Sequence, residues 1–341
     1  MPSRELDRAA PWVRVVIVNY NGGDHLARAV EGLAGQTAAD FEAVIVDNDS
    51  GDGSADRLAL PDRRFRLMRA GANLGFAAGC NLGARGAQTP WLAMLNPDAV
   101  PEAGWLEALR AATLNHPAAA LFGSTQLMGE DPDHLDGAGD FYSIFGIAWR
   151  GGYGASKDLV AGDIAAFSPC AAAGLYRRDV WEALDGMAER FFCYLEDVDI
   201  GFRARLAGHL VTQVAAARVT HAGSAISGRH SAFTLYHSAR NGVFLLVRCM
   251  PAALLVLALP LYVAAQGWLA TRTPRPRARL SGLLAGLAAI PSLRRDRAAI
   301  QRRRVSVVAV ARMLVWSPRR LSRREIVVLP KEEKASWRAF S

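Results

Sequence analysis

Cysteine is scarce in this sequence, and an unbroken apolar run long enough to cross a membrane is missing. Four cysteines occur in 341 residues, at positions 80, 170, 193 and 249. They are too few for a disulfide framework and too scattered for a metal knuckle, so we expect a reducing compartment. The segment Met1–Trp12 is charged and has no apolar signal region. A chain of this length can bury a substantial core, in one large or two medium domains.

Acidic residues are nearly missing from the end of the chain. Between Arg272 and Ser341 there are 18 Lys and Arg against 4 Asp and Glu, a net charge of +14. The whole chain carries +8, so residues 1–271 carry −6. A basic tail on a mildly acidic body suits nucleic acid or an anionic membrane surface. The arginines flank apolar helices without interleaved aromatics, so we do not expect nucleic acid as a partner.

The apolar stretches near this tail are short. The stretch 243–268 is interrupted by four residues, Arg248, Pro251, Pro260 and Gln266. The part between Pro251 and Ala265, which has no charged residue, is near the lower limit for a membrane span, and 280–293 is too short to cross alone. A single span would also export the basic tail, against the positive-inside tendency. We therefore expect membrane association without a full crossing, with a two-span hairpin, a single span or soluble core helices as alternatives.

The amino-terminal half alternates between predicted strands and helices. Val13–Val18 and Phe41–Val46 are apolar, β-branched runs typical of buried parallel strands. A helix is expected between them over 25–33, capped by Asp24. This order predicts a right-handed βαβ unit whose two strand-end loops lie side by side. A weaker strand, Phe65–Met68, follows.

Polar and small residues follow these strands, where open α/β sheets bind their ligands. Asp47 comes directly after the second strand, and a carboxylate there can accept the imide N–H of uracil or thymine. A solvated turn is the alternative. Small residues around Gly75 allow close backbone approach at a helix start, and Asn73 is within reach of a ribose or diphosphate. A glycine-rich helix packed tightly on the sheet is the alternative.

The apolar run Trp91–Leu95 stops at Asn96-Pro97-Asp98, because proline cannot continue a sheet ladder. Asp98 is therefore placed at the carboxyl end of a strand. A carboxylate there can hold a divalent cation, and the cation can hold a diphosphate. The alternative is an Asp that caps a helix expected over 101–114.

A second acidic cluster lies further along the chain. Glu196, Asp197 and Asp199 occur within four residues, after an aromatic stretch and before an apolar helix. Like charges at a helix start are costly unless the helix dipole or a cation offsets them. A partly desolvated carboxylate has a raised pKa and can take the proton of an attacking hydroxyl. Asp199 and Arg203 lie four apart and are suited to pair, while an acidic N-cap on a surface helix is the alternative.

Four motifs together resemble one family. They are Val18-Asn-Tyr-Asn21, Asp47-Asn-Asp-Ser50, Asn73-Leu-Gly-Phe76 and Leu95-Asn-Pro-Asp98. Their order and spacing resemble the family 2 glycosyltransferases, and more closely the bacterial rhamnosyltransferase-like branch. The resemblance implies a Rossmann-like α/β domain of the GT-A fold and inverting transfer from a dTDP- or UDP-sugar, with dTDP-rhamnose as one candidate. It also implies a polyprenyl-linked or cell-surface glycan acceptor and a divalent cation, Mg²⁺ or Mn²⁺.

The resemblance also implies the site residues. The donor would contact ten of them: Val18, Asn19, Tyr20, Asp47, Asn73, Gly75, Phe76, Asn96, Asp98 and Arg240. Asp197 matches the family's general base, and Glu196 would contact the acceptor together with Gly174 and Tyr194. Many relatives have an Asp-X-Asp triplet where this chain has Asn96, so a second metal ligand must come from elsewhere unless metal dependence is weaker. His221 is the candidate beside Asp98. A structural role for His221 and a helix cap for Arg240 are the alternatives.

We therefore predict three parts: a nucleotide-sugar-binding half (1–115), an acceptor-binding and catalytic half (116–242), and a basic, membrane-associated helical tail (243–341). Such an enzyme would work at the cytoplasmic face of the inner or plasma membrane. Residues 116–168 read as strands and loops, either over an active site or as a variable connection.

Two other functions fit parts of the sequence. A sugar nucleotidyltransferase would need a basic, glycine-rich triphosphate loop near the first strand, but 19–23 contains no Lys or Arg. A membrane-anchored sugar-nucleotide or glycan binder without activity would not need the run Glu196–Asp199.

Overall fold

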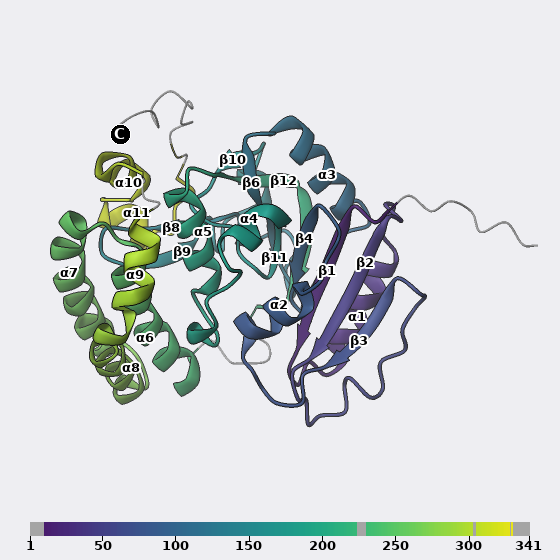
Figure 1. Ribbon diagram of the computed structural model, residues 1–341, viewed down its shortest axis with the longest axis horizontal. Coiled ribbons are helices and arrows are strands. Elements are labelled where there is room, and N and C mark those ends of the chain that lie inside the picture. Colours follow the sequence, from purple (N-terminus) through teal and green to yellow (C-terminus); the bar gives the residue numbers. More distant parts are fainter. Residues whose placement is uncertain (1–9, 224–229, 303–304, 328, 330–341) are drawn as a thin grey trace, which may run out of the picture.

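The computed structural model describes residues 10–223, 230–302, 305–327 and 329. A central sheet carries helices on both faces, and a group of carboxyl-terminal helices forms one end of the molecule (Figure 1). Most of the segment Met1–Trp12 and the end of the basic tail, from residue 330 on, lie outside the described residues.

The main sheet has ten strands. Their spatial order is β10-β12-β6-β11-β4-β1-β2-β3, with β5 beside β12 and β7 beside β6. The strands are β1 (Val13–Asn19), β2 (Phe41–Asp47), β3 (Phe65–Arg69), β4 (Trp91–Leu95), β5 (Ala99–Pro101), β6 (Ala119–Met128), β7 (Leu135–Gly137), β10 (Ile164–Ala165), β11 (Ala173–Arg177) and β12 (Leu210–His221). A separate two-stranded sheet pairs β8 (Asp140–Tyr142) with β9 (Ala148–Arg150).

The first four strands are parallel, as their apolar sequences predict. Asn19 lies opposite Asp47 in the register of β1 and β2, so the two strand-end loops begin side by side. The amide of Asn48 donates to the carbonyl of Asn19 at 2.8 Å. β11 then runs antiparallel between β4 and β6. Its start lies beside the end of β4, where the N–H of Asn96 donates to the carbonyl of Ala172 at 2.9 Å.

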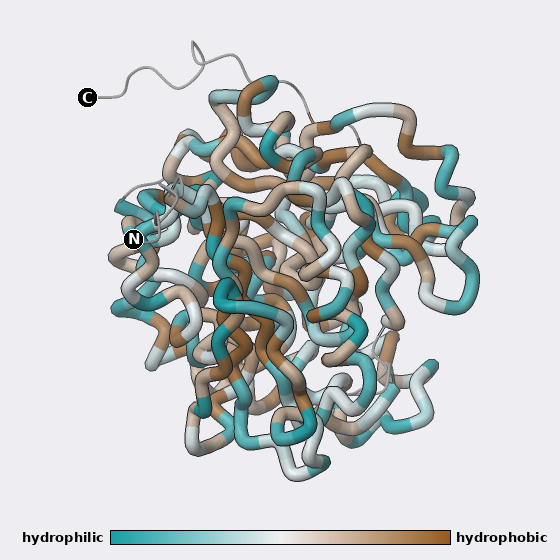
Figure 2. The backbone as a smooth tube through the Cα atoms, turned by 90° about the vertical axis from the view of Figure 1, so that its right-hand side faces the viewer, coloured by the Kyte–Doolittle hydropathy of each residue, from teal (hydrophilic) through white to brown (hydrophobic). Residues whose placement is uncertain are grey.

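Alternate strand residues build a core on each face of the sheet. One core contains the buried faces of α1 (Asp24–Ala34) and α3 (Trp105–Asn115). The other contains residues of α2 (Phe76–Ala84), α4 (Arg178–Ala183) and α5 (Glu196–Leu206). Viewed from the side, the hydrophobic strands gather inside the molecule and hydrophilic segments lie at its outer loops (Figure 2).

Two predicted helix starts were wrong. The helix expected from residue 101 begins at Trp105, because Ala99–Pro101 pairs with β12 as strand β5. Asp98 therefore does not cap it. Asp24 is the first residue of α1 and not its cap, and the preceding Gly23 makes no side-chain cap.

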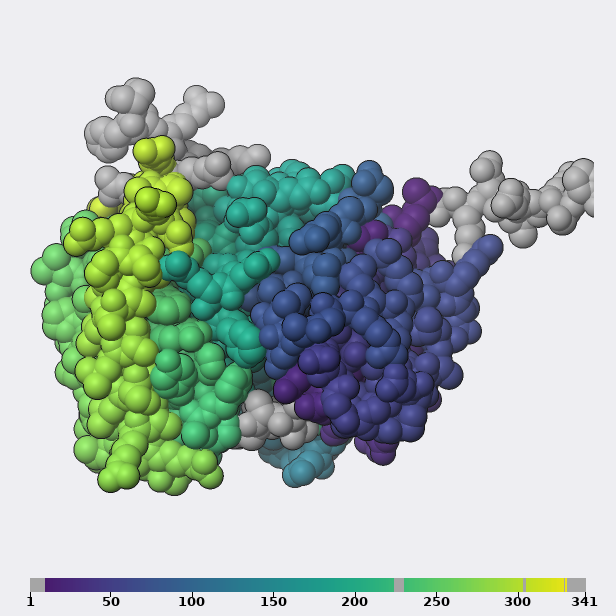
Figure 3. All heavy atoms as spheres, turned by 60° about the horizontal axis from the view of Figure 1, so that its bottom comes forward, coloured from purple at the N-terminus to yellow at the C-terminus, as the bar shows by residue number. Residues whose placement is uncertain are grey.

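The carboxyl-terminal helices pack into the catalytic half. They are α6 (Ala232–Cys249), α7 (Ala252–Ala270), α8 (Pro276–Ala288), α9 (Arg294–Gln301), α10 (Val307–Met313) and α11 (Pro318–Ser322), with the short 3-10 turn η3 (Ile290–Leu293) between α8 and α9. Two further 3-10 turns, η1 (Lys157–Leu159) and η2 (Glu189–Phe191), lie earlier in the chain. The core of the carboxyl-terminal helices includes Phe141, Tyr142, Phe167 and Phe202 from the preceding half. The boundary expected at 242/243 falls inside α6. Figure 3 shows these helices as one continuous end of the molecule.

Helix α7 is longer than predicted, because it continues through Pro260 to a length of 19 residues. Within the described part of the chain, it alone is long and apolar enough to cross a membrane. A core helix of a soluble protein can pass the same test, but only 22% of the most apolar part of α7 is buried. The low burial of α7 therefore argues against an ordinary core helix.

Candidate active site

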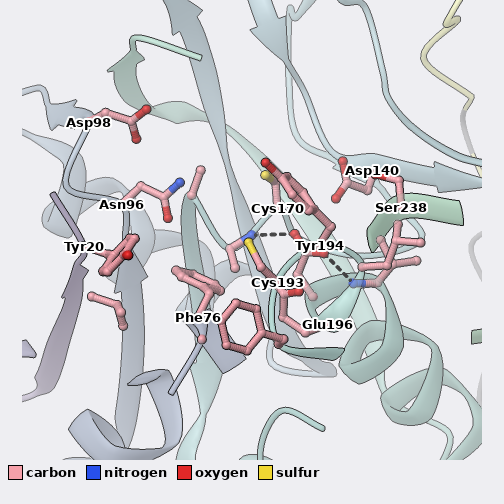
Figure 4. A pocket seen from close by; sticks show the side chains of 18 of the residues that line it. Tyr20, Phe76, Asn96, Asp98, Asp140, Cys170, Cys193, Tyr194, Glu196 and Ser238 are labelled. Atoms are coloured by element: carbon pink, nitrogen blue, oxygen red, sulfur yellow. Dashed lines mark hydrogen bonds between the residues drawn. The ribbon is translucent and has the colours of Figure 1, made fainter. Parts of the chain in front are cut away.

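A cavity of about 710 Å³ lies between the ends of β1 and β4 and the starts of α5 and α6. Figure 4 shows Tyr20, Asn96 and Asp98 on one side of it. Asp140 and Ser238 lie on the opposite side. The cavity therefore joins residues from the first and second halves of the chain.

Asp98 and His221 meet at one end of this cavity. The pairing of β5 with β12 sets His221 opposite Ala99, next to Asp98 in the chain. Nε2 of His221 lies 3.2 Å from Oδ1 of Asp98, and Nδ1 lies 2.7 Å from Oδ2 of Asp136. Burial alone would lower the pKa of His221, but the two carboxylates outweigh it and raise this pKa. Burial likewise opposes a charged Asp98, but His221 holds the pKa of Asp98 below its ordinary value.

These side chains fit a divalent cation. Oδ1 of Asn96 is buried without a hydrogen-bond partner among the described residues, and the buried Nε2 of His221 has Oδ1 of Asp98 as its neighbour. With a carboxylate oxygen of Asp98 they offer two oxygens and one nitrogen, a donor set that suits Mn²⁺ and, with added water, Mg²⁺. Asp136 binds Nδ1, so Nε2 would be the nitrogen that holds the cation, as in metal-bound histidines. Asn96 would thus contribute an oxygen at the position where many relatives have Asp.

Asp47 lies beside the cavity and does not line it. The side chain is buried, and its Oδ1 accepts from Nδ2 of Asn19 at 3.3 Å and from the amide of Ser50 at 3.4 Å. Its Oδ2 lies 3.5 Å from Arg69. Asn19 is equally buried, whereas the neighbouring Asn48 lines the cavity. Base recognition by Asp47 stays a prediction.

Five other expected donor residues line the cavity, namely Val18, Tyr20, Asn73, Gly75 and Phe76. Oδ1 of Asn73 accepts from Nδ2 of Asn48 and from the amide of Gly75, both at 3.0 Å, so it shapes its own loop. Gly75 has a φ of 83°, and a Cβ there would lie 2.5 Å from the Phe192 ring. The close approach that this glycine permits is therefore to the loop before Glu196.

Asp197 and Glu196 begin helix α5 at the other side of the cavity. Asp197 accepts from the amides of Val198 at 2.8 Å and Ala171 at 3.1 Å. Burial raises its pKa, although these amides and Arg150 oppose the rise. Burial and the charge of Asp197 raise the pKa of Glu196 much further, and Oε2 of Glu196 has no partner among the described residues. Glu196 therefore keeps its proton to higher pH, which favours Asp197 as the ionised base.

Asp199 does not face the cavity, since it is fully buried between two arginines. Its carboxylate lies 2.6 Å from Nε of Arg203 and 2.9 Å from Nε of Arg248 on α6. Burial would raise its pKa, but the two guanidinium groups hold that pKa below its ordinary value. The pairing of Asp199 with Arg203 is confirmed, and Asp199 joins α5 to α6.

Sequence reasoning missed four residues of the site: Asp136, Asp140, Arg150 and Cys170. Arg150 pairs with Asp136, while oxygen atoms of Asp140 and Asp197 and the sulfur of Cys170 lie within 4.8 Å of one another. Burial raises the pKa of Cys170 to about 12, so its thiol stays protonated and is a poor metal ligand. Burial and Asp197 raise the pKa of Asp140. The acidic stretch 131–140 was the sequence feature that could have indicated Asp136 and Asp140 as site residues. A variable loop between two strands can have the same composition, however, so the feature was not specific.

Two expected contacts lie away from the cavity wall. Gly174 is inside β11, and its upstream neighbours Cys170, Ala171 and Ala172 line the cavity instead. Arg240 donates to the carbonyl of Phe191 at 2.9 Å and holds the loop before α5. Tyr194, in contrast, lines the cavity.

A sequence profile described as Glycosyl transferase family 2 matches residues 14–184, half of the chain. The chain belongs to this family. It is 29% identical over 243 residues to an N-acetylglucosaminyl-diphospho-decaprenol L-rhamnosyltransferase of Mycobacterium tuberculosis (strain ATCC 25618 / H37Rv), which covers 64% of this chain and 78% of the relative. It is also 35% identical over 89 residues to the succinoglycan biosynthesis protein ExoO of Rhizobium meliloti (strain 1021), 26% of each chain.

Solved glycosyltransferase structures show the same fold. GalNAc-T7 with UDP, GalNAc and Mn²⁺ matches with a TM-score of 0.56 at 16% identity, over 72% of this chain and about half, 49%, of that one. The mannosyltransferase PcManGT from Pyrobaculum calidifontis with GDP-Man and Mn²⁺ matches with a TM-score of 0.50 at 16% identity, over 86% and 85% of the two chains.

These findings confirm the predicted GT-A fold and the rhamnosyltransferase-like branch. This family 2 member is a glycosyltransferase. The nucleotidyltransferase and the inactive binder are therefore set aside.

Proposed function

We propose that this glycosyltransferase moves a sugar, with inversion, from a nucleoside diphosphate to a hydroxyl of a polyprenyl-linked or surface-glycan acceptor. dTDP-rhamnose is the first candidate donor. One observation carries the proposal: a single cavity has the candidate cation ligands Asp98 and His221 at one side and Asp197 at another. In-line displacement needs these two functions around one anomeric carbon.

Different residues of the cavity have different roles in this reaction. Asp98, His221 and Asn96 would hold the cation, whose charge stabilises the leaving diphosphate. Asp197 takes the proton of the acceptor hydroxyl as that oxygen attacks the anomeric carbon. Glu196, which keeps its own proton, donates a hydrogen bond to the acceptor.

The choice of donor and acceptor rests on two supports. The Mycobacterium tuberculosis relative is named as an L-rhamnosyltransferase acting on a decaprenol-linked sugar, and it aligns over most of its length. A carboxylate at Asp47, beside the cavity, can accept the imide N–H of thymine or uracil. Both supports favour a dTDP- or UDP-sugar.

A donor panel tests this proposal by thermal shift. With Mn²⁺ present, dTDP-rhamnose at about 100 times its Kd should stabilise the protein by about 2.7 kcal/mol, a rise in Tm of a few degrees. UDP- and GDP-sugars are the comparisons, followed by transfer from radiolabelled dTDP-rhamnose to polyprenyl-diphospho-N-acetylglucosamine. Stabilisation by GDP-sugars alone would contradict the role given to Asp47, and stabilisation without transfer to any hydroxyl acceptor would contradict the activity.

The tail supports a second part of the proposal, that this end of the protein lies on the cytoplasmic leaflet. Val256 and Trp268 on α7 are 79% and 56% exposed, and Leu284 on α8 is 65% exposed. Arg272 lies over the Trp268 ring at 4.4 Å, so a cation adjoins the apolar surface. Apolar side chains beside arginines suit an anionic lipid surface, and a polyprenyl acceptor would lie in that membrane.

Vesicle sedimentation tests the lipid surface. The protein should sediment with vesicles containing about 30% phosphatidylglycerol and much less with neutral vesicles, because the arginines need anionic lipid. Salt near 0.5 M should release most of it, since screening weakens that attraction. The double variant Val256→Asp/Leu284→Asp should lose binding, whereas Leu114→Asp on α3, equally exposed at 76%, should keep it. Binding by the double variant would contradict the assigned surface, and resistance to salt would indicate a crossing.

A further inference from the structure

The loop that leads into Glu196 and Asp197 has an unusual backbone. Phe192, Tyr194 and Leu195 have φ angles of 65°, 73° and 67°. These angles lie in the left-handed region, which is unfavourable for every residue with a side chain. A loop of this kind keeps its shape only when surrounding groups fix it. It ends on the residue before the two carboxylates of the cavity.

One buried amide on α6 contacts this loop at three points. Asn241 is 0% exposed, and its Nδ2 donates to the main-chain carbonyls of Phe191 at 2.9 Å and of Cys193 and Tyr194 at 2.8 Å. The two amide hydrogens serve all three acceptors. Nε of Arg240 donates to Oδ1 of Asn241 at 2.9 Å, which directs the amide nitrogen toward the loop.

The same loop also contacts the donor side of the cavity. The carbonyl of Phe192 accepts from the amide of Ala77 at 3.2 Å, at the start of α2. Gly75, which lines the cavity, packs against the same phenylalanine. The loop therefore spans the space between the donor-side helix and the carboxylates, and its shape sets their separation.

Helix α6 is joined to α5 independently of this amide. Arg248, two turns beyond Asn241, pairs with the buried Asp199 of α5 at 2.9 Å. Gly75 likewise has its own support, because its amide donates to Asn73. Losing the amide of Asn241 should therefore free the loop while the helices and the donor side keep their places.

We propose that Asn241 is a positioning residue. Its amide holds the loop 191–195 in the left-handed conformation and so places Glu196 and Asp197 for the reaction. The catalytic consequence rests on the proposed sugar transfer, whereas the structural part does not depend on it.

Two variants and one control test the proposal. Asn241→Ala removes the amide, and Asn241→Asp keeps its shape but replaces the donor by an acceptor. Val243→Ala is the control, because Val243 is buried in the same helix and its loss lowers stability without removing a bond to the loop. Hydrogen exchange is followed by mass spectrometry on peptides covering 190–198 and on β1 and β4. Transfer from dTDP-rhamnose is measured in parallel.

Both Asn241 variants should exchange the loop amides at least about tenfold faster, with β1 and β4 unchanged. Their kcat should fall about tenfold or more while KM for the donor stays within about threefold, because the donor side is supported separately. Val243→Ala should change neither the loop exchange nor kcat.

Loop exchange as slow as in the unmodified protein in either Asn241 variant would overturn the proposal. An equal rise in exchange with Val243→Ala would do the same, since general loss of stability would then explain it. A third outcome separates the two proposals. If the Asn241 variants exchange the loop amides faster but the unmodified protein transfers sugar from no donor, the structural role of Asn241 is upheld and the proposed sugar transfer is refuted.

Discussion

The Asp197→Asn protein is expected to bind donor normally and to transfer sugar about 10²–10⁴-fold more slowly, since general base catalysis contributes that much. Asparagine fills the same space but cannot take a proton. The loss should therefore appear in kcat, with KM for the donor nearly unchanged. Initial rates of transfer from the donor found in the panel, with Tm measured on each protein, give the test.

Glu196→Gln is the matched comparison. Burial and Asp197 raise the pKa of Glu196 well above its ordinary value, and glutamine imitates the protonated form that this shift favours. Its effect on kcat should be at least about tenfold smaller than that of Asp197→Asn. The reverse order, with a near-normal rate for Asp197→Asn, would assign the proton transfer to Glu196.

The pH profile of the unmodified enzyme follows from the same carboxylate. A base must be ionised to work, and burial raises the pKa of Asp197 in the folded protein. The rate should fall as pH drops through that pKa, at a higher pH than for a solvent-exposed aspartate, whose pKa is about 3.9. This acid limb should be missing from the residual rate of Asp197→Asn.

The second large effect is expected at the other side of the cavity. Asp98→Asn should lower kcat/KM by roughly 10²–10³-fold, because the substitution removes the carboxylate of the candidate cation site and a bound cation supplies several kcal/mol of charge stabilisation. The Mn²⁺ concentration needed for half-maximal rate should rise with it. Titration of activity with Mn²⁺ and Mg²⁺ after treatment with a chelator measures both.

Asp136→Asn is the control for this site. Asp136 contacts His221 and would not touch the cation, so its loss should cost about 10–100-fold in metal affinity with a smaller effect at saturating metal. Full activity of the unmodified enzyme in excess chelator would refute the cation site. Equal behaviour of the two variants at saturating metal would show that Asp98 acts only through His221.

Strands and their terminal residues could be predicted from the sequence because the pattern is local. The runs ending at Asn19, Asp47 and Leu95 are apolar as buried parallel strands must be, and ligand sites follow the ends of such strands. Proline at 97 marked the end of β4 for a simple steric reason. Asp98 was found in this way, whereas Asp197 was found from an acidic run before an apolar helix and from the family resemblance; both line the cavity.

Residues that depend on pairing between distant segments could not be predicted. Asp136 and Arg150 reach the site through β7 and β9, two three-residue strands without a sequence pattern of their own. The register of β5 against β12 decides that His221 meets Asp98. Arg240 resembled a phosphate ligand, but its position on α6 directs it to main-chain carbonyls. The composition of a short segment does not indicate which distant segments of the chain it will contact.

The carboxyl-terminal helices and the catalytic half share one hydrophobic core. The proposed membrane contact and catalysis therefore depend on the same cooperative folding unit. Phe141, Phe167 and Phe202 pack with residues of α6, α7, α8 and α10, so neither part has a complete interior alone. The helices that would meet lipid are thus inseparable from the base that would meet the acceptor. The carboxyl-terminal helices therefore cannot be replaced as a separate module during evolution, because a different membrane-binding segment would require a different hydrophobic core in the catalytic half as well.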